Sequence, residues 1–203
     1  MTNDQRPDLA SELRVNTNQP SSFSFKHKVS RLIWGVVQST LFRWTPVPFH
    51  GVRRALLGLF GARLHPTARV YPTVKVWAPW NLEMEADSCM GPNVLCYNVD
   101  TIALERGALV SQNCHLCSAS HDYRDPAFRL IHAPIRLKPG CWVCADVFVA
   151  MGVTIGENAV VGARSVVIRN MPDNMVCSGF PCVPLKARFP VQPEGNAPGT
   201  GIA

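Results

Sequence analysis

The chain has 203 residues and a formal net charge of +6, with 47% hydrophobic and 17% charged residues. This length suits one domain with a buried core, and the apolar content excludes a disordered chain. The longest apolar stretch, Leu32 to Phe42, supplies about half of the roughly 20 residues that a membrane-spanning helix needs, which excludes a transmembrane protein.

The first 22 residues are polar and are interrupted by Pro7 and Pro20. This composition predicts a flexible tail over residues 1–22. The tail lacks the apolar core and the small-residue cleavage site of a secretory signal peptide, so we expect a cytoplasmic protein. The eight cysteines are then expected to be free thiols.

Residues 23–63 carry the apolar spacing of helices. Apolar side chains recur at intervals of three and four, and Pro46 and Pro48 separate them from a second short helical stretch at residues 51–60. We therefore expect an N-terminal helical segment over residues 23–63. The first stretch contains Val29, Leu32, Ile33, Val36 and Val37.

Positive charge is unbalanced in the same region. No Asp or Glu occurs between Leu13 and Leu82, although half of the basic residues lie there. Such a block attracts phosphate-bearing partners or an anionic membrane surface. No recognised nucleic-acid-binding motif accompanies it, so nucleic acid is not expected as a partner. The basic residues are Arg14, Lys26, Lys28, Arg31, Arg43, Arg53, Arg54, Arg63, Arg69 and Lys75.

A six-residue repeat dominates the middle of the chain. Aliphatic side chains occupy its frame from residue 64 to residue 167, with Ser88 as the one exception. A period of six fits neither a helix nor a simple meander, and it predicts short strands joined by tight turns. The frame consists of Leu64, Val70, Val76, Leu82, Ser88, Val94, Leu104, Val110, Leu116, Leu137, Val143, Val149, Ile155, Val161 and Val167.

Three such strands close a triangular coil of 18 residues, so the repeat predicts an all-β solenoid over residues 64–188. Residues 64–99 supply two coils, residues 104–121 one, and residues 137–172 two more, which gives about five. Residues 100–103 break the frame once, and residues 122–136 break it again as a protruding loop. Residues 189–203, rich in Pro and Gly, are expected to be a flexible tail.

The cysteines include two C-x-x-C pairs, Cys114 with Cys117 and Cys141 with Cys144, and this spacing is similar to that of a zinc ribbon. The repeat supplies a simpler explanation. Cys114 and Cys141 occupy small inward-facing positions, whereas Cys117 and Cys144 follow aliphatic positions and point elsewhere. Alternating directions do not build one tetrahedral cage, so we expect structural thiols and no metal.

The repeat resembles that of the hexapeptide-repeat acyltransferases. The N-terminal run beginning RLIWGVVQSTLFRW, the segment CSASHDYRDPAF and the segment FVAMGVTIGENAVVGARSVVIRN resemble, more narrowly, the colanic acid biosynthesis acetyltransferases, which act in exopolysaccharide assembly. The resemblance implies a left-handed parallel β-helix with acetyl-CoA as the acyl donor. It also implies a homotrimer, in which a neighbouring chain completes the site.

His121 opens the long loop and matches the family's catalytic histidine. A neutral imidazole, with an ordinary pKa near 6.5, can remove a proton from an attacking hydroxyl, so we expect His121 to be the general base. Asp122 either orients this imidazole or begins a turn. His115 and His132 are candidate substrate contacts, and Asn98 resembles an acceptor-binding Asn, with a turn-forming role as the alternative.

The donor site is expected along the later coils. Trp142 lies between two inward positions and should point outward, where related enzymes place a Trp beside the pantetheine arm. The sequence has no P-loop, so backbone amides and basic residues near the last coil would hold CoA. Lys186 and Arg188 could equally be solvated charges of the tail. The candidate CoA-binding residues are Trp142, Gly162, Ala163, Ser178, Gly179, Pro181, Lys186 and Arg188.

The resemblance implies a CoA-dependent O-acetyltransferase acting on a sugar hydroxyl of an exopolysaccharide intermediate. The alternatives are a free-sugar or small-molecule acetyltransferase of the same fold and a non-catalytic solenoid scaffold. Two interpretations of the helical segment stay open. It either caps the open end of the solenoid, or residues 26–63 contact the inner face of the cytoplasmic membrane, near a lipid-linked sugar acceptor.

Overall fold

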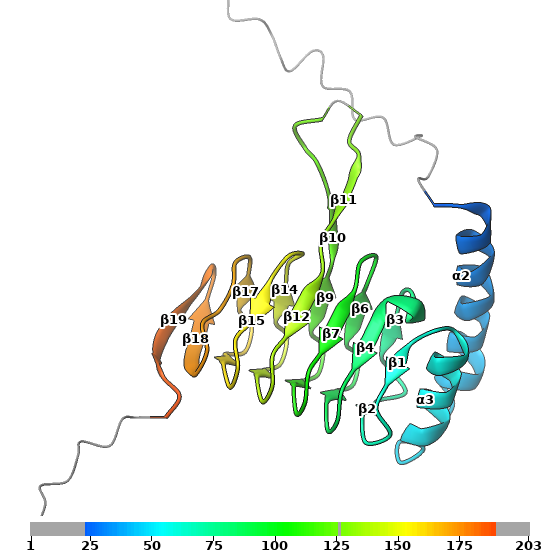
Figure 1. Cartoon of the computed structure of the whole chain (residues 1–203), viewed down its shortest axis with the longest axis horizontal. Helices are drawn as coiled ribbons and strands as arrows, with labels where there is room; N and C mark the ends of the chain where they lie inside the picture. Colours follow the sequence, from blue (N-terminus) through cyan, green and yellow to red (C-terminus); the bar gives the residue numbers. More distant parts are fainter. Residues whose placement is uncertain (1–22, 126, 190–203) are drawn as a thin grey trace, which may run out of the picture.

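The computed structural model describes residues 23–125 and 127–189. The tails predicted at residues 1–22 and 189–203 lie outside the described residues, except for residue 189. From residue 63 onward the chain winds through short strands that stack into three parallel sheets, the faces of a prism (Figure 1). The predicted β-solenoid is thus confirmed, whereas its left-handed winding stays a prediction from the resemblance.

We name the sheets A, B and C in the order in which the chain passes through them. Sheet A contains β1 (Arg63–Leu64), β4 (Leu82–Met84), β7 (Ile102–Leu104), β12 (Ile135–Leu137) and β15 (Thr154–Ile155). Sheet B contains β2 (Arg69–Val70), β5 (Cys89–Met90), β8 (Leu109–Val110), β13 (Trp142–Val143), β16 (Val160–Val161), β18 (Met175–Gly179) and β19 (Cys182–Ala187). Sheet C contains β3 (Lys75–Val76), β6 (Leu95–Tyr97), β9 (His115–Cys117), β14 (Phe148–Val149) and β17 (Val166–Val167).

Each coil passes once through the three sheets, and each strand of the inner coils pairs in parallel with the coils before and after it. Strand β12, for example, pairs with β7 and with β15. Five coils are complete, and a bridge from Ile155 to Met171 together with β18 adds part of a sixth. Strand β19 then folds back antiparallel on β18.

One column of apolar side chains per sheet fills the prism. In sheet B this column includes Val70, Met90 and Val110, all fully buried. At ten corners, the residue three places after an inward-facing residue has a positive φ. Residues with a side chain rarely adopt this left-handed conformation. Gly, Asn or Asp occupies nine of these corners, and Arg164 occupies the tenth.

The frame assigned to residues 82–94 was wrong by two positions. Leu64 pairs with Met84 rather than with Leu82, because the turn η2 (Pro79–Asn81) lengthens this passage. Ser88 and Val94 consequently lie at corners, not in strands. Both are nevertheless buried, because the residue two places before an inward strand residue also faces the core.

The prism has one edge at which coil length varies. Across the other two edges, from A to B and from B to C, successive inward strand residues are six positions apart. Across the edge from C to A they are eight, eight, 21 and six positions apart in the first four passages. These passages run from Val76 to Met84, from Cys96 to Leu104, from Leu116 to Leu137 and from Val149 to Ile155.

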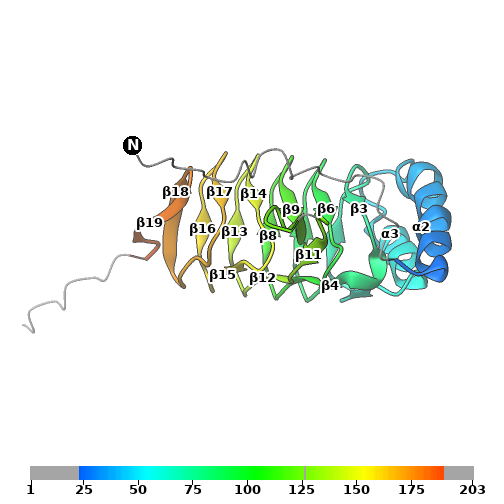
Figure 2. The ribbon, with the colours of Figure 1, turned by 90° about the horizontal axis from the view of Figure 1, so that it is seen from above.

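Helix α2 (Phe25–Val37), the π-helical turn η1 (Gln38–Phe42) and helix α3 (His50–Leu59) cover the N-terminal end of the solenoid (Figures 1 and 2). The first coil has no earlier coil to pair with, and side chains of the helices replace it. The Trp34 indole donates to the Val76 carbonyl over 2.7 Å, and the Gln38 side chain accepts from the Val76 amide over 2.7 Å. The helical segment therefore caps the solenoid.

Arg53 is part of this cap and not of a free basic surface. Its side chain is fully buried, and its guanidinium donates to the carbonyls of Val70, Pro46 and Val47 and to the Thr45 hydroxyl. The positive charge is thus satisfied by oxygen dipoles. One of the ten basic residues counted in the sequence is consequently unavailable to a partner.

Candidate functional site

A hairpin projects from the C-to-A edge of the third coil (Figure 1). Its strands are β10 (Ala119–His121) and β11 (Leu130–His132), paired antiparallel with Ala119 opposite His132 and His121 opposite Leu130. The predicted loop at residues 122–136 therefore begins too late. His121 lies at the outer end of this two-stranded ladder, where the connection to β11 begins.

The His121 imidazole is held by the turn that closes the hairpin. Its Nδ1 lies 2.7 Å from the Phe128 carbonyl oxygen, and its ring stacks on the Phe128 ring at 4.5 Å between centroids and 4° between planes. A carbonyl oxygen only accepts hydrogen bonds, so Nδ1 carries the proton and donates. In the neutral imidazole, Nε2 then keeps its lone pair, and the exposed ring presents a proton acceptor.

Asp122 bonds to the backbone of the hairpin turn. Its amide donates to the Arg129 carbonyl over 3.0 Å, and its Oδ1 accepts from the Arg124 amide over 3.0 Å. The His121 Nδ1 is already occupied by a backbone oxygen. This geometry favours the turn-forming interpretation of Asp122.

His132 and His115 occupy different environments. His132, at the root of the hairpin, lies with Nδ1 2.7 Å from Asp100 Oδ2 and is exposed. His115 lies in sheet C with its ring edge-on to Phe148, and burial lowers its pKa. Its Nε2 has no hydrogen-bond partner within the described residues.

Asn98 is fully buried between coils. Its Oδ1 accepts from the Ala78 amide over 2.9 Å, and its Nδ2 donates to the Ala78 carbonyl over 2.6 Å. Both ends of the side chain are therefore used by the neighbouring coil. The geometry favours a structural role over contact with an acceptor.

Trp142 points outward from sheet B, as the repeat predicts, with 41% of its surface exposed. Its indole donates to the Ser111 hydroxyl over 2.9 Å. The small CoA-binding candidates gather at the B-to-C edge near the end of the solenoid. There the Gly162 amide donates to the Cys177 carbonyl, and the Gly179 amide donates to Ser165.

The remaining donor-site candidates are spread more widely. Lys186 lies exposed on β19, and Ala163 and Pro181 are also exposed. Ser178, half-buried, lies next to Gly162, where an added Cβ would come 2.7 Å from the Ser178 hydroxyl oxygen. Arg188 reaches the A-to-B edge, where its guanidinium donates to the carbonyls of Gly140 and Asn158, each over 3.0 Å.

One chain does not bring His121 and Trp142 together. Sheet B is bordered by the A-to-B and B-to-C edges, whereas the hairpin rises from the third edge of the prism. In the triangular cross-section of the prism, the C-to-A edge lies opposite sheet B, which it does not border. A cleft that contains both residues therefore needs a second chain.

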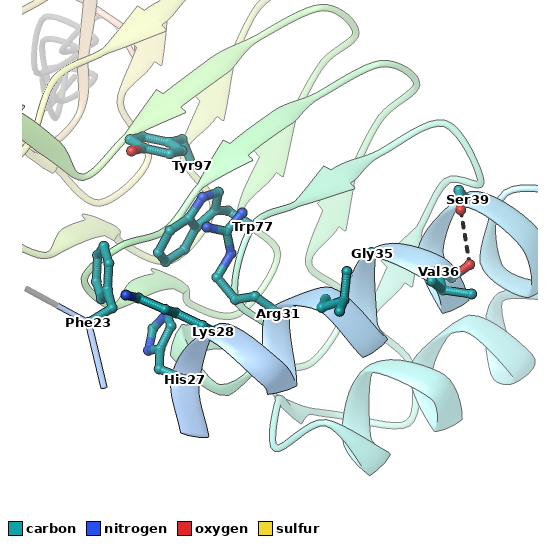
Figure 3. A pocket seen from close by; sticks show the side chains of 10 residues that line it. Phe23, His27, Lys28, Arg31, Gly35, Val36, Ser39, Trp77 and Tyr97 are labelled. Atoms are coloured by element: carbon teal, nitrogen blue, oxygen red, sulfur yellow. Dashed lines mark hydrogen bonds between the residues drawn. The ribbon is translucent and has the colours of Figure 1, made fainter. Parts of the chain in front are cut away.

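A large hollow lies elsewhere, between α2 and the first two coils (Figure 3). It has a volume of about 720 Å³ and is lined by Phe23, His27, Arg31, Trp77 and Tyr97, among others. The Arg31 guanidinium lies 3.7 Å from the centroid of the Trp77 ring. This groove is not predictable from the sequence, because it depends on a helix packing against residues some 50 positions away.

The paired cysteines lie as the repeat predicts. Cys114 and Cys141 are fully buried, and burial raises their pKa values to about 11 and about 12. Cys117 and Cys144 are only half-buried. Thiols that stay protonated are poor metal ligands. Within residues 23–125 and 127–189, no three His, Cys, Asp or Glu side chains converge on a common metal position.

Among the helices that the structure describes, none combines the length and the apolar character needed to cross a membrane.

Among known proteins, the chain is similar to acetyltransferases. No family model matches the sequence. The chain is 37% identical over 169 residues to the protein of Escherichia coli (strain K12) named as a colanic acid biosynthesis acetyltransferase, WcaF, which covers 83% of this chain and 93% of that protein. The galactoside O-acetyltransferase of the same organism is 26% identical over 133 residues, 64% of this chain and 66% of the relative.

Solved structures share the fold. A hexapeptide-repeat acetyltransferase of Vibrio cholerae complexed with acetyl-CoA aligns with a TM-score of 0.73 and 23% identity, over 89% of this chain and 98% of that one. A galactoside acetyltransferase in complex with CoA aligns with a TM-score of 0.69 and 20% identity, over 83% and 86%. With the solenoid, the extruded hairpin and the WcaF likeness over most of both chains, the protein belongs to the hexapeptide-repeat acetyltransferases.

Proposed function

We propose that the protein transfers an acetyl group from acetyl-CoA directly to a sugar hydroxyl of an exopolysaccharide intermediate, with His121 as the general base. The observation that carries the proposal is the bond between His121 Nδ1 and the Phe128 carbonyl. It fixes the tautomer in which Nε2 can accept a proton. The sugar acceptor is proposed from the likeness to WcaF and to the galactoside O-acetyltransferase.

In the proposed reaction, His121 acts first as a base and then as an acid. His121 Nε2 removes the proton of the sugar hydroxyl as its oxygen attacks the thioester carbonyl carbon. When the carbon–sulfur bond of the tetrahedral intermediate breaks, the new Nε2 proton passes to the departing thiolate. The products are an acetyl ester and CoA, and no acyl-enzyme forms. The stacked Phe128 ring and the Nδ1 bond hold the imidazole in one orientation during both transfers.

We further propose that the active unit is a homotrimer with its sites between chains. The separation of His121 from Trp142 supports this arrangement, because a neighbour can bring its own sheet B beside the hairpin. Trp142 would then contact the pantetheine arm. The residues near the end of the solenoid would bind the rest of CoA: Gly162, Ala163, Ser178, Gly179, Pro181, Lys186 and Arg188.

The test measures thiol release from acetyl-CoA with a panel of sugar acceptors. Replacing His121 by Ala should lower turnover by about 10²- to 10⁴-fold, the usual contribution of general-base catalysis, while melting temperature and CoA affinity change little. His65→Ala, which replaces an exposed histidine at the A-to-B edge of the first coil, is the matched control and should retain most of the activity. A His121→Ala loss of less than about tenfold would contradict the assignment.

Two further outcomes bear on the proposal. A fully active monomer in sedimentation would contradict the site between chains. Failure of the native protein to release thiol with any hydroxyl acceptor would favour a non-catalytic scaffold.

A further inference from the structure

The cap of the solenoid exposes a large apolar surface. More than half of the exposed large hydrophobic side chains in the described residues belong to the short segment from residue 25 to residue 59. Trp44 and Leu59 are each 81% exposed. Scattered apolar residues are normal on a protein surface, but a concentrated apolar patch marks an interaction site.

On α2 this surface is a continuous stripe. With about 3.6 residues per turn, its five exposed apolar residues fall within an arc of roughly 100°. Trp34, the residue that anchors the helix to the solenoid, lies on the far side of the helix from this arc. Packing of the cap therefore does not explain the stripe. Its residues are Phe25, Val29, Leu32, Ile33 and Val36.

Basic side chains flank the stripe. At the same rotation per residue, Lys26 lies on one side of it and Lys28 on the other, and both are exposed. Arg43 is also exposed, just beyond η1. No acidic residue occurs between Leu13 and Leu82 to neutralise them. An apolar face bordered by Lys and Arg, with an exposed Trp, is the pattern of a helix that lies in a membrane interface.

The groove beside α2 adds a polar site to this face. Leu32 and Val36 belong both to the stripe and to the groove wall, so the two surfaces are continuous. Figure 3 shows Lys28 and Arg31 on the groove side of α2, with Arg31 reaching toward Trp77. The Nε atom of Arg31 is buried and has no hydrogen-bond partner within the described residues. The exposed Lys28 ammonium and the Arg31 guanidinium at the groove wall suit a phosphate group.

We infer that residues 25–59 dock on an anionic lipid bilayer, with the stripe of α2 among the acyl chains and a lipid phosphate in the groove beside Arg31. The positive charge selects a bilayer with anionic headgroups over a second copy of this chain, which would bring the same basic residues face to face. The inference goes beyond the proposed acetyl transfer and does not depend on it.

Flotation of the full chain with lipid vesicles tests the inference, without CoA or acceptor. The chain should bind vesicles of phosphatidylglycerol and phosphatidylcholine, bind pure phosphatidylcholine much less, and dissociate as salt is raised. Lys26→Gln with Lys28→Gln should weaken binding by roughly 30-fold, because each cation near an anionic surface contributes about 1 kcal/mol. Leu32→Gln with Ile33→Gln should weaken it by about tenfold or more.

The matched control is Leu185→Gln. Leu185 is similarly exposed but lies on β19 at the opposite end of the solenoid, and its replacement should leave vesicle binding unchanged (Figure 1). Arg31→Gln should weaken binding to anionic vesicles about fivefold, the same contribution from a single cation.

Three results would overturn the inference. The first is failure of the full chain to bind anionic vesicles. The second is equal binding by the Leu32→Gln/Ile33→Gln variant. The third is a smaller assembly of that variant in sedimentation with unchanged vesicle binding, which would assign the stripe to contacts between copies.

Discussion

Replacing Arg53 by Met should destabilise the helical cap and remove its hydrogen bond to Val70 of the solenoid. The buried guanidinium donates to three carbonyls and one hydroxyl, and Met fills a similar volume without donating. Hydrogen bonds from charged groups contribute about 1.5–3 kcal/mol each, but they are not additive, and removing Arg also removes its desolvation cost. We therefore expect the free energy of opening of the cap to fall by about 3–5 kcal/mol.

Arg54 supplies the matched control for this prediction. It is half-buried and donates one hydrogen bond, to the Ala68 carbonyl over 2.9 Å, so Arg54→Met should cost about 1 kcal/mol. Amide hydrogen exchange in α3 is the appropriate assay, because a solenoid can open at one end without global unfolding. Equal opening free energies for the two variants, within about 1 kcal/mol, would refute the reasoning.

Four further substitutions test other parts of the structure. Gly156→Ala should destabilise the solenoid, because an added Cβ would lie 2.5 Å from the backbone of the next coil, whereas Gly58→Ala, with open space in a helix, should stabilise by about 0.5–1 kcal/mol in urea unfolding. Asn98→Ala should lower stability by about 1–3 kcal/mol, because it leaves the buried amide of Ala78 without a partner, whereas the Ala78 carbonyl keeps the hydrogen bond from the Asn81 amide. Burial lowers the pKa of His115, so the unfolded chain binds more protons and stability should fall as the pH drops below about 6.5. His115→Phe should weaken that dependence, and an unchanged pH profile of unfolding would contradict this account.

The frame error shows which part of the solenoid the sequence could specify. Side chains alternate along a strand, so a slip of one residue would turn the aliphatic column outward and be obvious. A shift of the frame by two residues leaves every side chain on the same face of its strand. Leu82 and Val94 are buried although they are not the residues that align with Leu64 and Val76, and Ser88 was the one visible misfit.

The candidate site was predictable only in part. His121 and the outward Trp142 follow from the repeat and from the resemblance, because each is defined by its position along the chain. The partners of Asn98 and His132 were not predictable. They depend on which residues lie one coil away, which are Ala78 and Asp100. The predicted repeat frame was shifted by two residues in this region, so it did not give the length of the coil.

The edge between sheets C and A has a consequence for engineering. At the other two edges, every turn has the same length and stacks on the turn of the next coil. An insertion there would therefore shift the register of every later coil. The third edge already accommodates passages of different lengths, including the hairpin that carries His121. A designed peptide of several residues grafted between Val149 and Val153 should therefore be displayed on the surface while the coils on either side keep their register. The same edge could carry a second hairpin and, with it, a new acceptor specificity.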